Sequence, residues 1–282
     1  METIYLINDL PFIDINFGQQ LGKVMNEDLR IEIVKMVKRS GEGHIPSSLS
    51  IVDILDHLYG KVLNVRPDEP DWEGRDYFIL SKGHGCGAFY AVLHKYGFLT
   101  DQDIEDYSTS KGILGGHPDA TIVPGAEAST GSLGHGFPTA VGIALGLKIQ
   151  NKENRVFALL GDGESQEGTI WEAANIAANH GLNNLCAIVD WNGSAAQLMP
   201  IDDLPAKWTA FGWETYVIDG HSTSDFNRIF SKISNSSSKK PKVIVAKNIK
   251  GKGVSITEGH GPWHHKVPND EEMKLILEEL ST

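Results

Sequence analysis

The fold is decided by the stretch Val156-Phe157-Ala158-Leu159-Leu160-Gly161-Asp162-Gly163-Glu164 and by a second stretch, Asp190-Trp191-Asn192-Gly193. A short apolar run that ends at a glycine is typical of a buried parallel strand. Residues 164–179 carry apolar residues at helical spacing, and the apolar run 185–189 predicts the next strand. Together they predict a β-α-β unit of a doubly wound sheet.

Two short oxygen-bearing side chains follow the two predicted strands, Asp162 after the first and Asn192 after the second. The carboxyl ends of parallel strands share one edge of a sheet, and ligands bind at that edge. Carboxylate and amide oxygens suit a hard cation such as Mg²⁺. The neighbouring glycines allow a phosphate to approach the backbone closely. The pattern therefore predicts a diphosphate that is held through a divalent ion.

A dinucleotide-binding loop is the competing interpretation, because Gly161-Asp162-Gly163 followed by Gly168 resembles a loose glycine fingerprint. The third glycine comes two positions too late for the G-x-G-x-x-G spacing. The charge of Asp162 would also face a pyrophosphate, which is unfavourable unless a cation lies between them. The spacing and the charge both favour binding through a metal.

The composition is ordinary for a globular protein in water. At 282 residues, 40% hydrophobic and 22% charged, the chain has ample apolar material for a core. A net charge of −12 argues against nucleic acid or an anionic membrane as the main partner. No apolar run is long enough to span a membrane, and the N-terminus lacks the basic start of a signal peptide. Cys86 and Cys186 have no metal-like spacing, which favours a reducing cytoplasm.

Strand and helix patterns alternate from residue 26 onward, without repeats or linkers. This alternation predicts one doubly wound α/β domain over residues 26–282, and we expect residues 1–25 to form an arm that packs on the domain or on a partner. The first predicted helix covers residues 26–40. Ser47-Ser48 are expected to cap a second helix, which runs to Leu58.

Two loops have the composition of anion-binding sites. Ser81-Lys82-Gly83-His84-Gly85 joins a predicted strand over 77–80 to a predicted helix over 86–96, and a lysine and a histidine at a helix start suit an anion. Residues 129–136 combine glycines and hydroxyls, which leaves backbone N–H groups free for phosphate oxygens. A capped helix start is the structural alternative for the first loop. His221, after another predicted strand, is expected to be structural.

Several motifs together resemble those of a known family. Gly161-Asp162-Gly163 with Asn192 resembles the thiamine diphosphate motif, and residues 163–168 with Trp171-Glu172-Ala173-Ala174 resemble its transketolase branch. Within that branch, the length resembles the separate N-terminal subunit of split transketolases. The resemblance implies the diphosphate-type domain of the thiamine diphosphate-binding fold, a doubly wound and mostly parallel sheet flanked by helices.

The resemblance also implies the cofactors and the residues of the site. The cofactors would be thiamine diphosphate and Mg²⁺, or another divalent cation such as Ca²⁺ or Mn²⁺. The implied metal ligands are Asp162, Asn192 and the backbone carbonyl of Ser194. The implied cofactor-binding residues are Lys82, His84, Gly131, Ser132, Leu133, Gly161, Gly163, Glu164, Asn192, Lys250 and Lys266. The implied catalytic residues are His44, His84, His117 and His264, which would transfer protons, and Glu167, which would act as a relay near an interface between subunits.

Five positions depart from the family pattern. Ile45 separates His44 from the proline of its turn, Ser47 replaces a glycine in the same turn, and His135 stands where the family usually has glutamine. Ser194 replaces an apolar residue that contacts the cofactor, and His265 replaces a glycine. These substitutions favour a specialised donor or acceptor, which fits a biosynthetic role.

The implied reaction transfers a two-carbon ketol unit from a ketose to an aldehyde in carbohydrate metabolism. The family's cofactor-activating glutamate belongs to a second, pyrimidine-binding domain. We therefore expect this chain to act only with a separate C-terminal subunit, in an α₂β₂ heterotetramer in the cytoplasm. Two alternatives stay open: an α-type subunit of a thiamine-dependent 2-oxoacid dehydrogenase or decarboxylase, and a non-catalytic scaffold that binds cofactor or partner. The histidines and residues 164–168 favour transketolase over the dehydrogenase.

Overall fold

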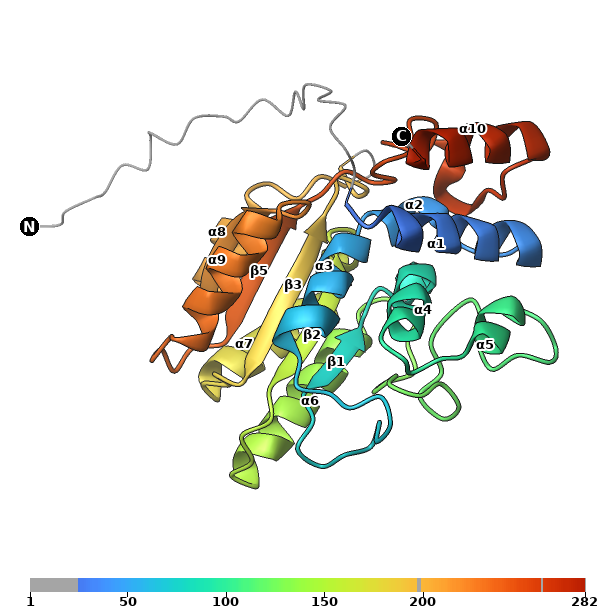
Figure 1. The fold of residues 1–282 in the computed structure, drawn as a ribbon. Coiled ribbons are helices and arrows are strands. Elements are labelled where there is room, and N and C mark those ends of the chain that lie inside the picture. The colour runs from blue at the N-terminus through green and yellow to red at the C-terminus, as the bar shows by residue number, and fades with distance from the viewer. Residues whose placement is uncertain (1–24, 197–198, 260, 282) are drawn as a thin grey trace, which may run out of the picture.

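Figure 1 shows the computed structural model, in which residues 25–196, 199–259 and 261–281 are described. The sheet has five strands in the order β1-β2-β3-β5-β4, and all neighbouring pairs are parallel. The strands are β1 (Tyr77–Leu80), β2 (Val156–Gly161), β3 (Leu185–Trp191), β4 (Glu214–Asp219) and β5 (Lys242–Lys247). The predicted α/β class and doubly wound parallel sheet are confirmed. The predicted arm lies outside the described residues, apart from Met25.

Helices cover both faces of the sheet, and successive strand residues alternate between the two sides. One core packs β-strand residues against α3 (Val52–His57), α4 (Cys86–Lys95) and α9 (Thr223–Ser234), with α1 (Glu27–Ser40) and α10 (Asp270–Leu280) packed farther out. The other core packs against α6 (Gly136–Ile149), α7 (Gly168–Asn179) and α8 (Leu204–Ala210). Figure 1 shows α3 and α9 in front of the sheet and α6 and α7 behind it. In β2, Phe157 and Leu159 face the first core, and Val156, Ala158 and Leu160 face the second.

Short elements complete the fold between these helices and strands. They are α2 (Ile45–Leu49), α5 (Asp101–Glu105), a π-helical turn (Leu58–Val62) and 3-10 turns η2 (Gly83–Gly85), η3 (Glu164–Gln166) and η4 (Pro262–His265). None of the helices in the described ranges combines the length and apolar character that crossing a membrane requires.

The prediction that Ser47-Ser48 cap a helix through Leu58 is wrong. The helix begins earlier, at Ile45, because Pro46 has the backbone angle of a first helical turn and needs no N–H partner there. Both serines are buried inside α2, and the pattern is then interrupted before α3. His44 is left at the N-cap of α2, where its ring faces the edge of the sheet that carries the candidate site.

Arg30 of α1 is fully buried and joins segments that lie far apart in the chain. Its guanidinium pairs with Asp53 at 2.6 Å. It also donates to the carbonyl oxygens of Leu49 at 2.9 Å and Lys252 at 2.7 Å. Asp53 accepts a second bond, at 2.8 Å, from Nδ1 of His221. The predicted structural role of His221 is therefore confirmed.

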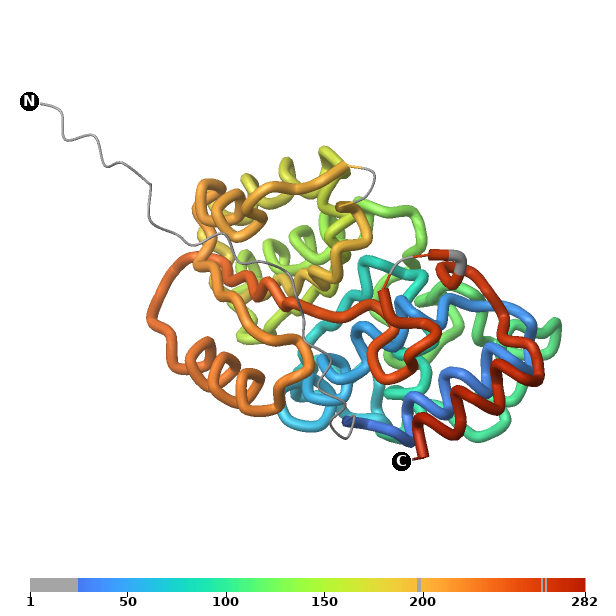
Figure 2. Tube along the Cα trace, turned by 90° about the horizontal axis from the view of Figure 1, so that it is seen from above, coloured from blue at the N-terminus to red at the C-terminus, as the bar shows by residue number. Residues whose placement is uncertain are grey.

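The C-terminal helix α10 packs along α1, and the two lie side by side in Figure 2. Lys38 of α1 pairs with Asp270 at 2.7 Å and donates to the carbonyl oxygen of Pro268 at 2.9 Å. This anchor fixes the end of the segment that follows β5, and that segment carries several of the candidate site residues.

We expect the substitution Arg30→Met to lower the free energy of unfolding by about 3–5 kcal/mol, because Asp53 would keep a buried charge without its cation. Urea denaturation of the purified chain would measure this loss. Arg66→Met is the matched control, since Arg66 pairs with Glu69 at the surface and should change the free energy of unfolding by less than about 1 kcal/mol. Equal losses in the two variants would contradict the assigned role of Arg30.

Candidate active site

Two predicted metal ligands lie at the carboxyl ends of neighbouring strands. β2 ends at Gly161 and β3 at Trp191, so Asp162 and Asn192 follow directly. The register pairs Gly161 with Asp190, and the N–H of Asp162 donates to the carbonyl oxygen of Asp190 at 3.1 Å. The position predicted for both side chains, at one edge of the sheet, is confirmed.

The Asp162 carboxylate is buried. Its side chain accepts from the N–H of Gly163 at 2.7 Å. Burial, together with the nearby charge of Asp190, raises the pKa of Asp162 to about 6. None of the ion pairs among the described residues includes Asp162. A bound divalent cation would stabilise the charged form, so this carboxylate fits a metal ligand.

The Asn192 amide is held in one orientation by its neighbours. Its Nδ2 donates to Asp190 at 2.9 Å and to Ser50 at 3.2 Å, while its Oδ1 accepts from the N–H of Ser194 at 3.0 Å. Across the described ranges, no three His, Cys, Asp or Glu side chains are arranged to hold a metal ion. A cation beside Asp162 and Asn192 would therefore depend on oxygen atoms from a phosphate and water, which Mg²⁺ prefers.

A buried carboxylate that the sequence analysis did not single out organises this edge. Asp190 is 0% exposed and accepts four hydrogen bonds. The donors are Lys82 at 2.5 Å, Asn248 at 2.6 Å, Ser50 at 2.7 Å and Asn192 at 2.9 Å. The available signal was a carboxylate inside an apolar strand, which requires buried donors around it. Asp190 is thus a positioning residue for Asn192.

Two lysines reach the site, and they have different roles. Lys82 is 2% exposed, pairs with Asp190 and donates to the carbonyl oxygen of Ser47 at 3.4 Å. Its ammonium group is therefore already paired with a carboxylate. Lys250 forms no ion pair within the described ranges, and its Nζ lies 3.4 Å from Nδ1 of His264. Burial and the charge of Lys82 lower the pKa of Lys250, and a bound anion would restore its charged form, so this lysine is the better candidate for binding an anion.

Glu164 holds the loops around the site together. Its carboxylate is 1% exposed and accepts from the hydroxyl of Ser81 at 2.5 Å. It also accepts from the N–H groups of Gly134 at 3.0 Å and Gly161 at 3.2 Å. Burial raises the pKa of Glu164, and these donors oppose that shift. Glu164 thus fixes the ends of β1 and β2 relative to the glycine-rich loop of residues 129–136, which we call the glycine loop.

The two predicted anion-binding loops contact each other. A Cβ atom on Gly83 would lie 2.7 Å from the backbone nitrogen of Gly131. Gly131 itself has a φ of +143°, and a Cβ there would lie 2.8 Å from the ring of His117. Glycine is required at both positions for this close approach. The next residues, Ser132 and Leu133, remain accessible at the surface of the loop.

The structure brings the four predicted histidines into one cluster. The ring centroid of His44 lies 5.5 Å from that of His84, 5.3 Å from that of His264 and 6.4 Å from that of His117. A fifth imidazole, that of His265, lies nearest to His44, at 4.6 Å. We name these five residues the histidine cluster.

The inner imidazoles of the histidine cluster are neutral near pH 7. Burial and the neighbouring imidazoles lower the pKa of His44 to about 4. Burial and the charge of Lys82 lower the pKa of His84 to about 2. Burial and Lys250 also lower the pKa of His264. A neutral imidazole has one nitrogen that donates and one that accepts, so these rings suit hydroxyl and carbonyl ligands.

Three residues that the sequence singled out lie outside the histidine cluster: Glu167, Lys266 and His135. Glu167 is exposed at the N-cap of α7. Lys266 pairs with Glu272 at the start of α10, which anchors its segment. His135 is exposed before α6, and its Nδ1 donates to the carbonyl oxygen of Leu133 at 3.0 Å.

A cavity of about 250 Å³ opens beside η4. Lys250 and His264 contribute to its wall, so it adjoins the histidine cluster and the unpaired lysine. Its other lining residues are Pro46, Ile256, Thr257, Glu258, Gly259, Gly261 and Trp263.

A parallel doubly wound sheet with these groups at its strand ends defines a cofactor-binding α/β domain. The family described as "Transketolase, thiamine diphosphate binding domain" matches residues 22–281. The chain therefore belongs to the transketolase family, as its thiamine diphosphate-binding domain.

Individual relatives agree with this family. An apulose-4-phosphate transketolase subunit from Phocaeicola vulgatus is 37% identical over 264 residues, covering 92% of this chain and 93% of that protein. The 6-deoxy-6-sulfo-D-fructose transketolase subunit SqwG from Clostridium sp. (strain MSTE9) is 36% identical over 249 residues, covering 86% and 90%.

Solved structures of transketolases share the fold. That from Campylobacter jejuni superposes with a TM-score of 0.85 at 29% identity, covering 94% of this chain and 43% of the solved chain. That from Leishmania mexicana gives a TM-score of 0.84 at 26% identity, covering 90% and 40%. This chain thus spans about two fifths of the solved transketolases it matches.

The low pKa values predict how stability depends on pH. His84 has a folded pKa of about 2, below its ordinary value of 6.5, so the unfolded chain binds the proton more tightly. Its contribution is complete above pH 6.5 and is lost as the pH falls below that value. Replacing it, as His84→Asn, should reduce the loss of unfolding free energy between about pH 7 and about pH 5.5 by about 1 kcal/mol.

Urea denaturation of the unliganded chain at the two pH values would measure this difference. His180→Asn is the control, because His180 is exposed at the end of α7 and lies outside the histidine cluster. An unchanged pH dependence in the His84 variant would show that this ring is not buried as a neutral group.

Proposed function

We propose that this chain is the cofactor-binding subunit of a two-component transketolase, which moves a two-carbon ketol unit from a ketose to an aldehyde. The observation that carries the proposal is the edge of the sheet where the histidine cluster meets a buried carboxylate, Asp162, and a lysine, Lys250, neither of which forms an ion pair among the described residues. The names of the relatives support transketolase over a 2-oxoacid dehydrogenase. Residues 26–282 would form the domain, acting in the cytoplasm, as the two unpaired cysteines favour.

The cofactor would bind at the strand ends. Asp162, Asn192 and the carbonyl of Ser194 would hold Mg²⁺ or a similar cation. Lys250 and the backbone of Gly131 would face the diphosphate, with other contacts from His84, Ser132, Leu133, Gly161 and Gly163. Lys82 and Glu164 would act indirectly, since both are engaged with protein groups. Lys266, paired with Glu272, would likewise support its segment.

The histidines would handle protons while the cofactor supplies its own chemistry. Bound thiamine diphosphate would supply the nucleophilic carbon and the electron sink for making and breaking carbon–carbon bonds beside a carbonyl. The imidazoles of His44, His84, His117 and His264 would accept a proton from one hydroxyl and return it to another oxygen.

A second polypeptide would complete each site. Relatives of similar length are named as single subunits of transketolases, which implies a partner for those proteins. Glu167 is exposed beside Gly134 and the glycine loop, so it is available to a partner at the cofactor site. We place the partner there, in a heterotetramer with two copies of each chain.

The substrate class is a ketose donor and an aldehyde acceptor. Two relatives are named for apulose 4-phosphate and for 6-deoxy-6-sulfo-D-fructose. Together with the substituted positions His135, Ser194 and His265, these names favour a specialised sugar for this chain.

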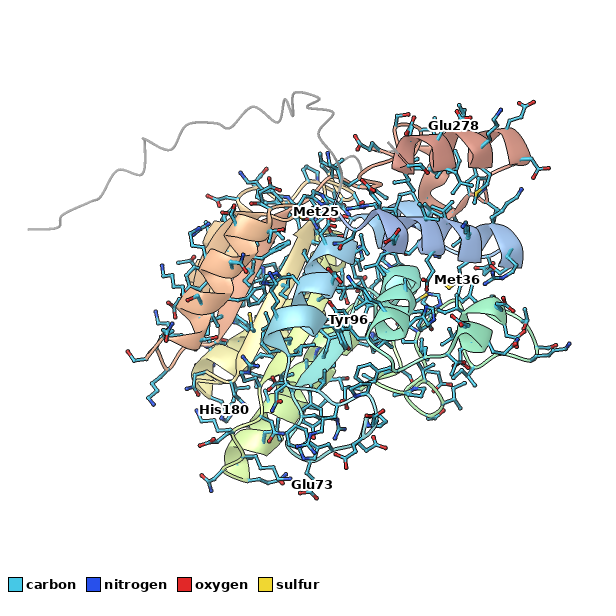
Figure 3. The ribbon with its side chains drawn as sticks, viewed as in Figure 1. Met25, Met36, Glu73, Tyr96, His180 and Glu278 are labelled. Carbon is cyan, nitrogen blue, oxygen red and sulfur yellow. The ribbon has the colours of Figure 1, made fainter. Side chains whose placement is uncertain are left out.

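We expect Asp162→Asn to weaken thiamine diphosphate binding in the presence of Mg²⁺ by about 100-fold or more, because the cation would lose its charged protein ligand. Isothermal titration calorimetry with and without Mg²⁺ would measure the affinity. Asp71→Asn is the control, since it lies in the same loop as Glu73, which Figure 3 labels at the opposite end of the sheet. Metal-dependent binding that survives Asp162→Asn would reject the assigned ligand.

Ketol transfer should require both polypeptides. The purified chain, saturated with thiamine diphosphate and Mg²⁺, should show no turnover on ketose and aldehyde mixtures, because the group that activates the cofactor belongs to the partner. Adding the C-terminal subunit should restore turnover, which mass spectrometry of the products would follow. Robust turnover by the chain alone would refute the two-component proposal, and turnover on pyruvate instead would favour the dehydrogenase class.

A further inference from the structure

Glu42 and His265 form a pair at the outer edge of the histidine cluster. Nε2 of His265 lies 2.9 Å from Oε1 of Glu42, and the two residues are 223 positions apart in the chain. The side chain of His265 is 48% exposed and that of Glu42 is 43% exposed. Both are therefore open to a ligand that enters from solvent.

The pair connects three loops of the candidate site. Glu42 lies in the turn between α1 and α2, two positions before His44. Its Oε1 lies 3.7 Å from the place where a Cβ on Gly116 would stand, beside the loop that carries His117. His265 belongs to η4 and lies 4.6 Å from His44, centroid to centroid. A ligand that approaches His44 from the solvent next to His265 therefore passes the pair.

The carboxylate determines which nitrogen of His265 is free. An ionised carboxylate only accepts hydrogen bonds, so Nε2 carries the proton and donates it to Glu42. In the neutral ring, Nδ1 is then left as an acceptor for a hydroxyl donor. Glu42 also fixes the ring, because the hydrogen bond limits its rotation.

The negative charge of Glu42 disfavours an anionic group of a ligand beside the pair. A phosphate or sulfonate beside Glu42 would meet a like charge, whereas a hydroxyl would find an acceptor at Nδ1 of His265. The proposed anion-binding group, Lys250, lies next to His264, with its Nζ 3.4 Å from Nδ1 of that ring. Anionic groups of a ligand would thus bind at Lys250, and hydroxyl groups at Nδ1 of His265.

We infer that Glu42 and His265 form a specificity-determining pair, which binds a hydroxyl group of the sugar substrate and excludes an anionic group at that place. The inference rests on the proposed transketolase function and assigns a role to a histidine where the family has a glycine. It makes the pair a positioning device for the hydroxylated carbon chain and assigns it no proton-transfer step.

The test uses the complete two-component enzyme and compares a neutral aldose acceptor with its terminal phosphate ester. Glu42→Gln should shift the ratio of kcat/KM values toward the phosphate ester by about tenfold, because the like charge is removed at constant shape. His265→Gly should raise KM for the neutral aldose several-fold, with kcat changed by less than about twofold. Glu271→Gln, an exposed carboxylate on α10, is the matched control and should leave the ratio unchanged.

Nitrogen NMR of the isolated chain gives a second readout that does not depend on turnover. His265 should show the Nε2–H tautomer in the wild type and a mixture of tautomers in Glu42→Gln. An unchanged acceptor ratio and tautomer in Glu42→Gln would overturn the inference while leaving the transketolase proposal intact. Absence of ketol transfer by the wild-type complex would overturn the proposed function instead.

Discussion

The buried ion pair between Lys82 and Asp190 is the interaction on which the candidate site depends. Both side chains are almost completely removed from water, and each would be costly to bury alone. The buried Asp190 carboxylate is surrounded by four donors inside the sheet, and one of those donors is the Asn192 amide. The pair therefore fixes the loop after β1 against the end of β3 and orients a proposed metal ligand with the same carboxylate.

The pairing of Lys82 with Asp190 gives the two lysines of the site, Lys82 and Lys250, different roles. Lys82 forms an ion pair with Asp190, which stabilises the fold. Its charge also lowers the pKa of His84 and so helps to keep that ring neutral. Lys250 has no carboxylate partner in the described ranges and adjoins a cavity, so its charge is available to a ligand. Asp162 is the complementary case, a buried carboxylate that forms no ion pair with the other described residues. An anionic cofactor and a divalent cation would together satisfy Lys250 and Asp162, which is why both groups fit one ligand.

Five imidazoles pack closely in the histidine cluster because the inner ones are uncharged. Protonated rings at centroid separations of about 5 Å would repel each other, and the burial that lowers the pKa of His44 and His84 removes that repulsion. Neutral rings near pH 7 also present one nitrogen that donates a hydrogen bond and one that accepts it. The cluster thus combines dense packing with the chemistry expected of a ketol-transfer site.

The sequence by itself determined the strands, their parallel order around β2 and β3, and the edge at which Asp162 and Asn192 meet, because apolar runs and glycines act over short distances along the chain. It failed at α2, where Pro46 overrode the serine cap. Only the tertiary structure decided which distant side chains form ion pairs and hydrogen bonds with each other. Lys82 and Asp190 are 108 positions apart, and Glu42 and His265 are 223 positions apart. Periodicity cannot report such contacts, since burial and charge pairing arise only once the sheet has brought the loops together.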